Sequence, residues 1–160
     1  MKIGIISDTH GLLRPQVFEH FEGVEHILHA GDLGPLELLA ELEAIAPVTI
    51  VWGNTDGMEV CARLPETAML TLDGVQVVVI HGHQLGSPTP RRLAAAHPGA
   101  GLVVFGHTHQ PLVERIGDTL LVNPGSAGPR RFSQPVSLAT ADVEDGRIET
   151  RLITLAPDRP

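Results

Sequence analysis

The sequence predicts an α/β protein built from two packed mixed β-sheets with helices on the outside. Three observations lead to this fold class. Strand and helix patterns alternate in the first half of the chain, and turn signals separate β-rich runs in the second half. The apolar runs are hydrophobic almost throughout, which is typical of strands covered on both faces. A single doubly wound sheet is the alternative.

Five short apolar runs are expected to form the buried strands, because β-branched and aliphatic residues dominate them. They are Ile3–Ile6, Ile27–Leu28, Val48–Trp52, Val75–Ile80 and Leu102–Phe105. Each is far shorter than the roughly 20 apolar residues that a membrane-spanning helix requires. We therefore expect no membrane association and no signal peptide.

Three segments between these runs are expected to be helical. Leu36, Leu39 and Leu42 recur at helical spacing and form a wide apolar stripe. Pro35 suits the first turn of that helix, since proline is favoured there. Pro15–Phe21 and Pro90–His97 can open two shorter helices in the same way.

Three dipeptides in the second half predict β-hairpins. Asp73-Gly74, Gly117-Asp118 and Asp145-Gly146 each lie between β-rich runs. Such pairs favour tight two-residue turns between antiparallel strands. The chain therefore begins with strand–helix alternation and ends in antiparallel strands, which two mixed sheets can accommodate together.

Length and composition limit the classes of function. The 160 residues fit one domain, which we expect to span 1–160. Hydrophobic residues make up 42% and charged residues 19%, which excludes a disordered chain. A net charge of −8, with four Phe, one Trp and no Tyr, predicts no stable nucleic-acid binding. Cys61 is the only cysteine, which favours a reducing, cytoplasmic location.

Polar side chains that can bind metal ions follow each of the five apolar runs. Seven of them are Asp8, His10, Asp32, Asn54, His81, His107 and His109, and His83 lies two residues beyond His81. A single Asp or His in such a place usually serves a turn or cap. The same pattern at five successive strand ends has no common structural explanation. Because sites in α/β sheets form beyond the carboxyl ends of strands, we expect these side chains to converge.

The chemistry of these side chains points to a pair of metal ions. Seven oxygen and nitrogen donors are too many for one ion but suit two ions that share a carboxylate. Carboxylate, imidazole and amide donors without a thiolate favour Mn, Fe, Zn or similar metals over Ca or a structural zinc. Two ions about 3.5–4 Å apart can generate a hydroxide and clamp a phosphoryl group.

The motifs together resemble the calcineurin-like metallophosphoesterase superfamily. They are Asp8-Thr9-His10, Gly31-Asp32, Gly53-Asn54, His81-Gly82-His83 and Gly106-His107-Thr108-His109, in this order. The opening Ile6–Gly11 and the later Asn123–Ser126 are similar to the short prokaryotic YfcE-type phosphodiesterases. The resemblance runs from about residue 1 to 154. It implies a four-layer αββα sandwich and a dinuclear metal-dependent phosphodiesterase, in which a hydroxide bridging the metals attacks phosphorus.

The resemblance also implies a role for each motif residue. Asp8, His10 and His109 would hold one ion, Asn54, His81 and His107 the other, and Asp32 would bridge both. These same seven residues would form the catalytic site, with Asn54 and His83 binding substrate. The expected cofactor is two divalent ions per chain, with Mn favoured and Fe, Ni, Co or Zn as alternatives. The expected partner is a small phosphate ester, and a homo-oligomer is compatible with the family.

One motif departs from the superfamily pattern. Many members have Gly-Asn-His-(Glu/Asp), whereas this chain has Gly53-Asn54-Thr55-Asp56. Thr55 cannot replace an imidazole in acid catalysis near neutral pH, which disfavours esters with poor leaving groups. Asp56 can either assist proton transfer or serve a turn. Arg131 can either bind phosphate or lie in a solvated turn.

Two other functions remain open at this stage. One is a phosphomonoesterase, or a nucleotide or protein phosphatase, of the same superfamily. The other is a non-catalytic, metal-binding interaction scaffold, as in the retromer subunit of this superfamily, because a fold alone does not determine function. The intact set of seven ligand-type residues favours the enzyme.

Overall fold

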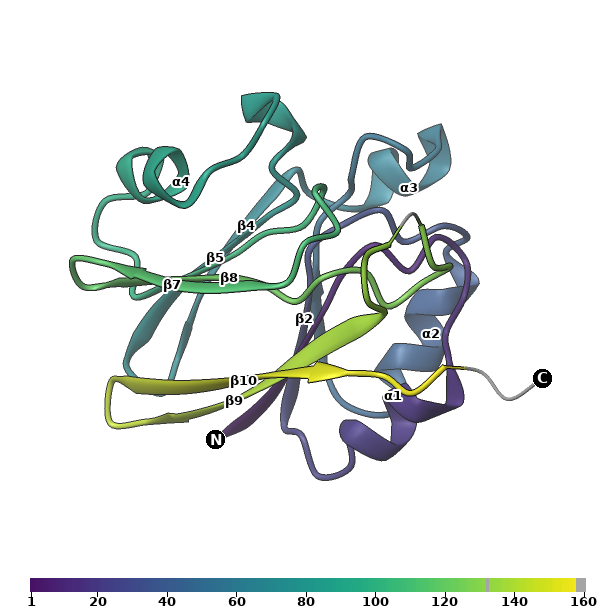
Figure 1. Cartoon of the computed structure of the whole chain (residues 1–160), viewed down its shortest axis with the longest axis horizontal. Helices are drawn as coiled ribbons and strands as arrows, with labels where there is room; N and C mark the ends of the chain where they lie inside the picture. Colours follow the sequence, from purple (N-terminus) through teal and green to yellow (C-terminus); the bar gives the residue numbers. More distant parts are fainter. Residues whose placement is uncertain (132, 158–160) are drawn as a thin grey trace.

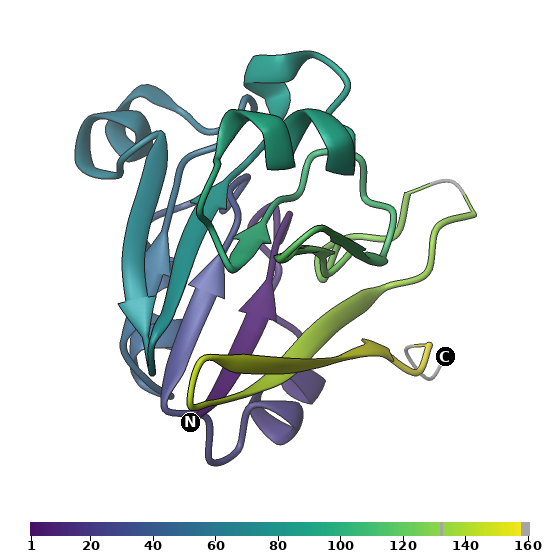
Figure 2. The same cartoon turned by 90° about the vertical axis from the view of Figure 1, so that its left-hand side faces the viewer.

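The computed structural model describes residues 1–131 and 133–157 and contains two mixed five-stranded sheets (Figures 1 and 2). The first has the order β10-β9-β1-β2-β3 and the second β4-β5-β6-β8-β7. Each sheet combines parallel pairs, such as β1 with β2, and antiparallel pairs, such as β1 with β9. The prediction of two mixed sheets is confirmed, and the single doubly wound sheet is excluded.

The elements have the following bounds. The strands of the first sheet are β1 (Lys2–Ile6), β2 (His26–His29), β3 (Val48–Ile50), β9 (Ser137–Glu144) and β10 (Arg147–Thr154). Those of the second are β4 (Thr67–Leu72), β5 (Val75–Ile80), β6 (Leu102–Val104), β7 (Leu112–Ile116) and β8 (Thr119–Asn123). The helices are α1 (Pro15–His20), α2 (Glu37–Glu43), α3 (Met58–Arg63) and α4 (Pro90–Ala96), with a 3₁₀ turn at His83–Leu85.

Apolar residues fill the space between the two sheets and the space between each sheet and the helices on its outer face. Ile5 of β1 and Val104 of β6 belong to the buried cluster between the two sheets. Phe21, directly after α1, packs with Ile6 on the outer face of the first sheet. Leu93 of α4 packs on the outer face of the second sheet. The result is the expected αββα sandwich, in which both faces of the central strands are covered.

The helices follow the sequence signals with two exceptions. α1 and α4 begin at Pro15 and Pro90, as predicted. α2 is bounded at Glu37 rather than at Pro35, because the preceding residues form a tighter turn that leads into the helix, in which the Leu38 N–H bonds to the Pro35 carbonyl. α3 was not predicted: it has six residues and buries only Val60, so it leaves no apolar stripe in the sequence.

No helix within residues 1–131 and 133–157 is both long enough and apolar enough to cross a membrane.

The three predicted hairpin turns are confirmed. Asp73-Gly74 joins β4 to β5, and both turn residues have positive φ, at 41° and 82°. Asp145-Gly146 joins β9 to β10 with φ of 50° and 79°. Gly117-Asp118 joins β7 to β8. Turns with positive φ match the twist of the flanking strands, and this sets the register of each hairpin.

A close contact in the first sheet gives a test of the packing. A methyl group on Gly4 would lie 2.8 Å from the Phe21 ring. We expect Gly4→Ala to lower the free energy of unfolding by about 1–3 kcal/mol, because the buried ring has little room to move. In a Phe21→Leu background the same substitution should lose most of its effect. Urea unfolding of the four proteins measures this coupling, and additive effects would contradict the steric explanation.

Candidate metal centre

The ends of five strands meet at one end of the sandwich. Within the first sheet, the Asp8 N–H donates to the Gly31 carbonyl at 3.0 Å. Within the second, the Gly106 N–H donates to the His81 carbonyl at 3.0 Å. The His107 N–H donates to Asp8 Oδ2 at 3.3 Å and so joins the two sheets. The structure therefore brings together segments that lie far apart in the sequence, as predicted.

Two glycines make this close approach possible. A side chain at Gly53 would collide with the Asp32 carboxylate, and one at Gly106 would collide with the Asp8 carboxylate and the Ser7 hydroxyl. In each case the carboxylate occupies the space that a Cβ atom would need. The glycine beside a candidate ligand is therefore required by packing, not only by turn geometry.

The first group of candidate ligands contains Asp8, His10 and His109, whose donor atoms lie within 4.8 Å of one another. Asp8 is completely buried, and its Oδ2 accepts the Ser7 hydroxyl at 2.6 Å. Its Oδ1 is buried without a hydrogen-bond partner among the described residues, although His109 Nε2 lies 3.1 Å away. A buried carboxylate oxygen left without a donor but facing imidazole nitrogens fits a site that holds a cation.

The second group contains Asp32 and His81, together with Asp8. Asp32 Oδ2 lies 3.2 Å from His81 Nε2, and it lies 3.8 Å from His10 Nε2 of the first group. Asn54 Oδ1 lies 3.0 Å from His81 Nε2 and 3.1 Å from His107 Nδ1. Asp32 therefore stands between the two groups, where a bridging carboxylate would have to be.

The orientation of His81 is set by a backbone contact that the sequence did not reveal. Its Nδ1 donates to the Ala30 carbonyl at 2.7 Å. The other ring nitrogen, Nε2, therefore faces Asp32 and Asn54. An outer hydrogen bond of this kind selects the tautomer and presents one nitrogen as a ligand.

The charges at the centre shift several pKa values. Burial alone would raise the pKa of Asp32, but the hydrogen bond and charge of His81 and the Thr55 N–H hold it well below its usual range. Burial lowers the pKa of His10 and of His107, against the opposing charges of Asp8 and Asp32. The pKa of His81 moves the other way: burial would lower it, but the hydrogen bond to Asp32 and the charge of Asp8 raise it. Metals bind ionised carboxylates and neutral imidazoles, so Asp32, His10 and His107 are shifted toward their metal-binding forms, whereas an ion would have to displace the proton of His81.

Five of the seven candidate ligands adopt a backbone conformation that is rare for residues other than glycine. They are Asp8 (φ 54°), His10 (45°), Asp32 (54°), His107 (72°) and His109 (60°). Among the described residues, the other non-glycine positions with positive φ are the hairpin residues Asp73 and Asp145. Each such residue costs about 1–2 kcal/mol, and strain of this kind collects at functional sites.

Buried His29 supports the loop that carries His10. The Gly31 N–H donates to His29 Nδ1 at 3.1 Å, and His29 Nε2 lies 3.0 Å from the Thr9 hydroxyl, which donates to the Leu33 carbonyl. This series of hydrogen bonds requires that the His29 ring be neutral, with its proton on Nε2. Burial lowers the pKa of His29 to about 4. The sequence contained one signal for this role, a histidine two residues before Gly31 of the Gly31-Asp32 motif.

Asn123 performs a similar task for the loop that carries His107 and His109. Its Nδ2 donates to the Gly106 carbonyl at 3.2 Å and to the Thr108 hydroxyl at 3.0 Å, while its Oδ1 accepts the Gly125 N–H at 2.9 Å. Asn123–Ser126, one of the segments that carry the resemblance, is therefore a tight backbone feature beside the site.

The remaining predicted residues take different positions. The ring of His83 lies 5.4 Å from that of His81 and 5.2 Å from that of Trp52, so His83 borders the ligand cluster. Asp56 accepts the Gly34 and Gly53 N–H groups with its two carboxylate oxygens, at 3.1 and 2.8 Å. Asp56 therefore ties two loops together, which favours the turn role over proton transfer.

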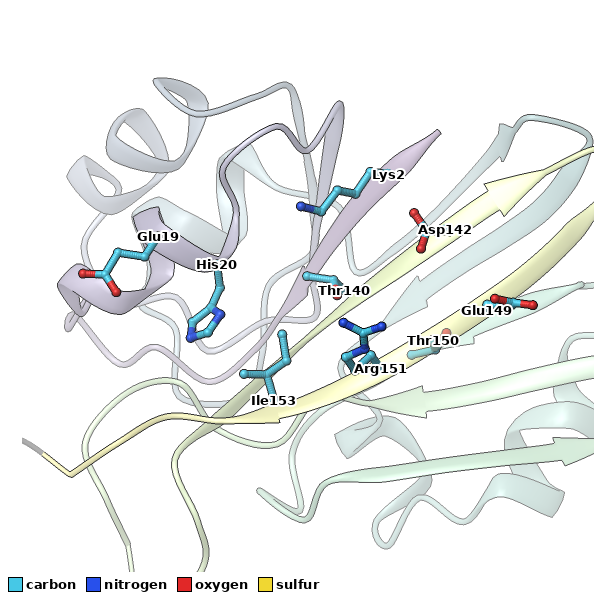
Figure 3. Close-up of a pocket in the computed structure, with 9 residues that line it drawn as sticks. All are labelled: Lys2, Glu19, His20, Thr140, Asp142, Glu149, Thr150, Arg151 and Ile153. Carbon is cyan, nitrogen blue, oxygen red and sulfur yellow. The ribbon is translucent and has the colours of Figure 1, made fainter.

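An open recess adjoins the ligands. It has a volume of about 370 Å³ and is lined by His107, Thr108, His109, Gln110, Arg131 and Gln134. The charge of Arg131 reaches His10 and lowers its pKa further. A second recess, of about 360 Å³, lies against α1, β9 and β10, and none of the candidate ligands lines it (Figure 3). Its lining includes Lys2 and Arg151 but also Glu19, Asp142 and Glu149, which is typical of a solvated surface of mixed charge.

Fold and site together define a class of protein. An α/β sandwich that gathers carboxylate, imidazole and amide donors at its strand ends has the features of a metal-dependent hydrolase. Residues 1–146 match the model of the calcineurin-like phosphoesterase superfamily domain, so the chain belongs to this superfamily. The resemblance drawn from the motifs is thereby confirmed.

Known proteins agree with this assignment. The chain is 36% identical over 163 residues to a probable metallophosphoesterase of Methanothermobacter thermautotrophicus, covering 96% of this chain and 92% of the relative. It is 30% identical over 165 residues to the phosphodiesterase YfcE of Escherichia coli, covering 89% and 88%. The structure of Vps29 from Entamoeba histolytica in complex with Zn²⁺ superposes with a TM-score of 0.78 at 24% identity, covering 96% and 99%, and supports the fold.

The buried His29 predicts a specific dependence of stability on pH. Its folded pKa of about 4 lies below the ordinary 6.5, so the unfolded chain binds the extra proton between these values. The stability contributed by the neutral ring is complete above pH 6.5 and is lost as pH falls toward 4, a loss of up to about 3 kcal/mol. His29→Gln, which can keep both hydrogen bonds, should show a flatter curve in urea unfolding between pH 7 and 4. If the free energy of unfolding of wild type and of His29→Gln fell equally between pH 7 and 4, His29 would not be the source of this pH dependence.

Proposed function

We propose that this chain is a dinuclear metal-dependent phosphodiesterase. The observation that carries the proposal is the convergence of seven donor side chains. Five of them form two groups that meet at Asp8 and Asp32, and Asn54 and His107 lie beside His81. In this proposal Asp8, His10 and His109 hold one ion, and Asn54, His81 and His107 hold the other. Mn is the favoured metal, and Fe, Ni, Co and Zn suit the same donors. A reducing, cytoplasmic setting belongs to the proposal and is supported by the single Cys61.

The donor set fits such a pair of ions. The unpartnered Asp8 Oδ1 and the nitrogens of His10 and His109 face one another without a proton donor that would satisfy all three. When bound, two divalent ions would supply a nucleophilic water at neutral pH and neutralise negative charge on the phosphoryl group. The chain's own part is to hold its donors in position, through Ala30 for His81 and through Asn123 for the loop of His107 and His109.

Other residues are suited to bind the substrate. Asn54 is exposed, and its amide nitrogen can donate to a phosphate oxygen while Oδ1 faces His81 and His107. His83 borders the same cluster and can contact the substrate beyond the phosphate. Arg131 lines the recess beside His109 and adds positive charge to it. The recess is open, which suits a small phosphate ester.

Thr55 supports a diester with a good leaving group as the substrate. Its hydroxyl lies 3.5 Å from His10 Nδ1, at the position where many superfamily members have a histidine. A threonine offers little general acid catalysis, which is typically worth about 10²–10⁴-fold in rate. A diester also carries one fewer negative charge than a dianionic monoester, which favours its approach to an acidic protein. These arguments favour aryl diesters over alkyl monoesters and thus over the phosphatase alternative.

The scaffold alternative is supported by the structural likeness to Vps29. The retention of every predicted ligand favours the enzyme, because a scaffold has no need for two carboxylates buried at that end. Hydrolysis that depends on these ligands would separate the two functions.

Metal content gives the first test of the proposal. We expect about two ions per chain by elemental analysis and titration calorimetry. Asp32→Asn should weaken both ions together, because one bridging oxygen would lose its charge, whereas His109→Ala should weaken mainly one. His20→Ala, in α1, is the matched control and should leave both ions bound. Full activity with only one ion bound would contradict the dinuclear proposal.

Substrate preference gives the second test. With Mn²⁺ present, wild-type protein should hydrolyse aryl phosphodiesters faster than alkyl phosphomonoesters, and a chelator should abolish the activity. His107→Ala should lower diester turnover strongly. Thr55→His restores an imidazole at the rim and should raise monoester turnover relative to diester turnover. Steady-state kinetics with both substrates measures this ratio; a wild-type preference for alkyl monoesters would count against the proposal.

A further inference from the structure

The segment between β5 and α4 carries His83 past the candidate ligands. After His81 it forms the short 3₁₀ turn His83–Leu85, and α4 begins a few residues later (Figure 1). The centre of the His83 ring lies 5.4 Å from that of His81 and 6.4 Å from that of His107. Because His83 belongs to neither group of candidate ligands, its position relative to the site depends on how this turn is held.

The hydrogen bonds within this turn are of a weak kind. The Leu85 N–H donates to the Gly82 carbonyl at 3.1 Å, and the Gly86 N–H donates to the His83 carbonyl at 2.9 Å. Bonds between residues three apart have poorer geometry than those of an α-helix, which is why such turns are short. The Gly82 N–H also donates to Gln84 Oε1 at 3.1 Å. Contacts from outside the turn are therefore important for keeping it in one conformation.

Arg92 of α4 supplies such contacts. Its Nη1 donates to the Leu85 carbonyl at 2.6 Å and to the Ser87 carbonyl at 3.3 Å. A hydrogen bond from a charged donor is stronger than one between neutral groups. The backbone of Arg92 is itself fixed, because its N–H donates to the Thr89 hydroxyl and the next residue, Leu93, is completely buried against the second sheet. Arg92 thus ties the end of the turn to a helix that is packed on the sheet.

The neighbouring arginine lacks these contacts. Arg91 and Arg92 are both exposed residues of α4. Within residues 1–131 and 133–157 neither forms an ion pair, and of the two only the Arg92 side chain makes hydrogen bonds. The Arg92 charge is therefore directed at main-chain carbonyls of one loop, and Arg91 is a control of the same type in the same helix.

A ring from the other sheet also contacts His83. The centre of the Trp52 ring lies 5.2 Å from that of His83, with the two rings tilted by 42°. Trp52 follows β3 and directly precedes Gly53-Asn54, and its N–H donates to the Pro65 carbonyl at 3.0 Å. His83 is thus held both by its own turn and by a fixed ring beside another ligand motif. Trp52 is the only tryptophan of the chain, so its fluorescence reports on this contact.

We propose that Arg92 is a positioning residue for the substrate: it fastens the turn that presents His83 to the ester group beyond the phosphate. This inference rests on the proposed phosphodiesterase function, in which His83 contacts the substrate. Arg92 acts on the substrate only through His83, so its loss affects substrate binding and leaves the candidate ligands in place.

Quenching of Trp52 fluorescence by acrylamide tests the contact without metal or substrate. In the chelator-treated full chain, His83→Ala should raise the quenching constant, because the Trp52 ring loses a neighbouring ring. Arg92→Met should reproduce most of this rise, and Arg92→Lys less of it, since lysine keeps a charged donor. Arg91→Met removes the same charge from the same helix and should match wild type. Wild-type quenching in Arg92→Met would overturn the proposal.

Steady-state kinetics with an aryl phosphodiester and Mn²⁺ test the role toward the substrate. Arg92→Met should raise KM about 5- to 10-fold and leave kcat within about twofold, as expected for a loss of binding alone. The double variant with His83→Ala should have the same KM as His83→Ala, because Arg92 acts through His83. Arg92→Lys should restore part of the loss, and Arg91→Met should leave both constants unchanged.

The outcomes separate this inference from the proposed function. An unchanged KM in Arg92→Met, or KM increases that multiply in the double variant, would overturn the positioning role. Circular dichroism of each variant at the assay temperature excludes unfolding as the cause of a higher KM. Wild-type protein without any hydrolysis would overturn the proposed function and with it the role toward the substrate, whereas the quenching experiment would still show whether Arg92 fixes His83.

Discussion

Two carboxylates buried close together are the constraint around which this end of the molecule is organised. Asp8 and Asp32 are 0% and 3% exposed, and their donor atoms share a group with His81. Burying ionised groups is costly unless positive charge or hydrogen bonds compensate. The chain supplies hydrogen bonds from Ser7 and Thr55 but leaves one Asp8 oxygen without a donor. Beyond the neighbouring imidazoles, a bound cation would supply the remaining compensation, which agrees with membership of a metallophosphoesterase family.

The sequence predicted much of this fold because the relevant signals are local. Continuous apolar runs indicated strands covered on both faces, and Asp-Gly turns located the hairpins. The predictions that failed also have physical reasons. α3 buries one side chain, so periodicity cannot reveal it. α2 starts later than Pro35 because Pro35 belongs to a tighter turn that leads into the helix. The strand order could not be predicted either, since β9 inserts beside β1 through contacts between opposite ends of the chain.

The candidate site could be predicted from the sequence to about the same extent as the fold. Motifs after strands identified the candidate donor residues that the structure brings together, because the topology carries them to one end of the sandwich. The residues that hold those donors in position could not be predicted from the sequence. Ala30 orients His81 through a carbonyl, and Asn123 fastens a loop 15 residues away. Such contacts depend on which loops become neighbours in space, and this information is absent from a motif. Asp56 illustrates the limit, since only its contacts with Gly34 and Gly53 revealed a turn role.

The left-handed backbone at five of the candidate ligand positions has a consequence for how this site can change. Besides glycine, the residue types that tolerate this conformation best are asparagine, aspartate and histidine. A glutamate or cysteine at Asp8, His10 or Asp32 would carry conformational strain before any ion was considered. The main chain thus admits the harder oxygen and imidazole donors and discriminates against thiolates. Selection for a different metal would have to alter the loops before it could alter the side chains.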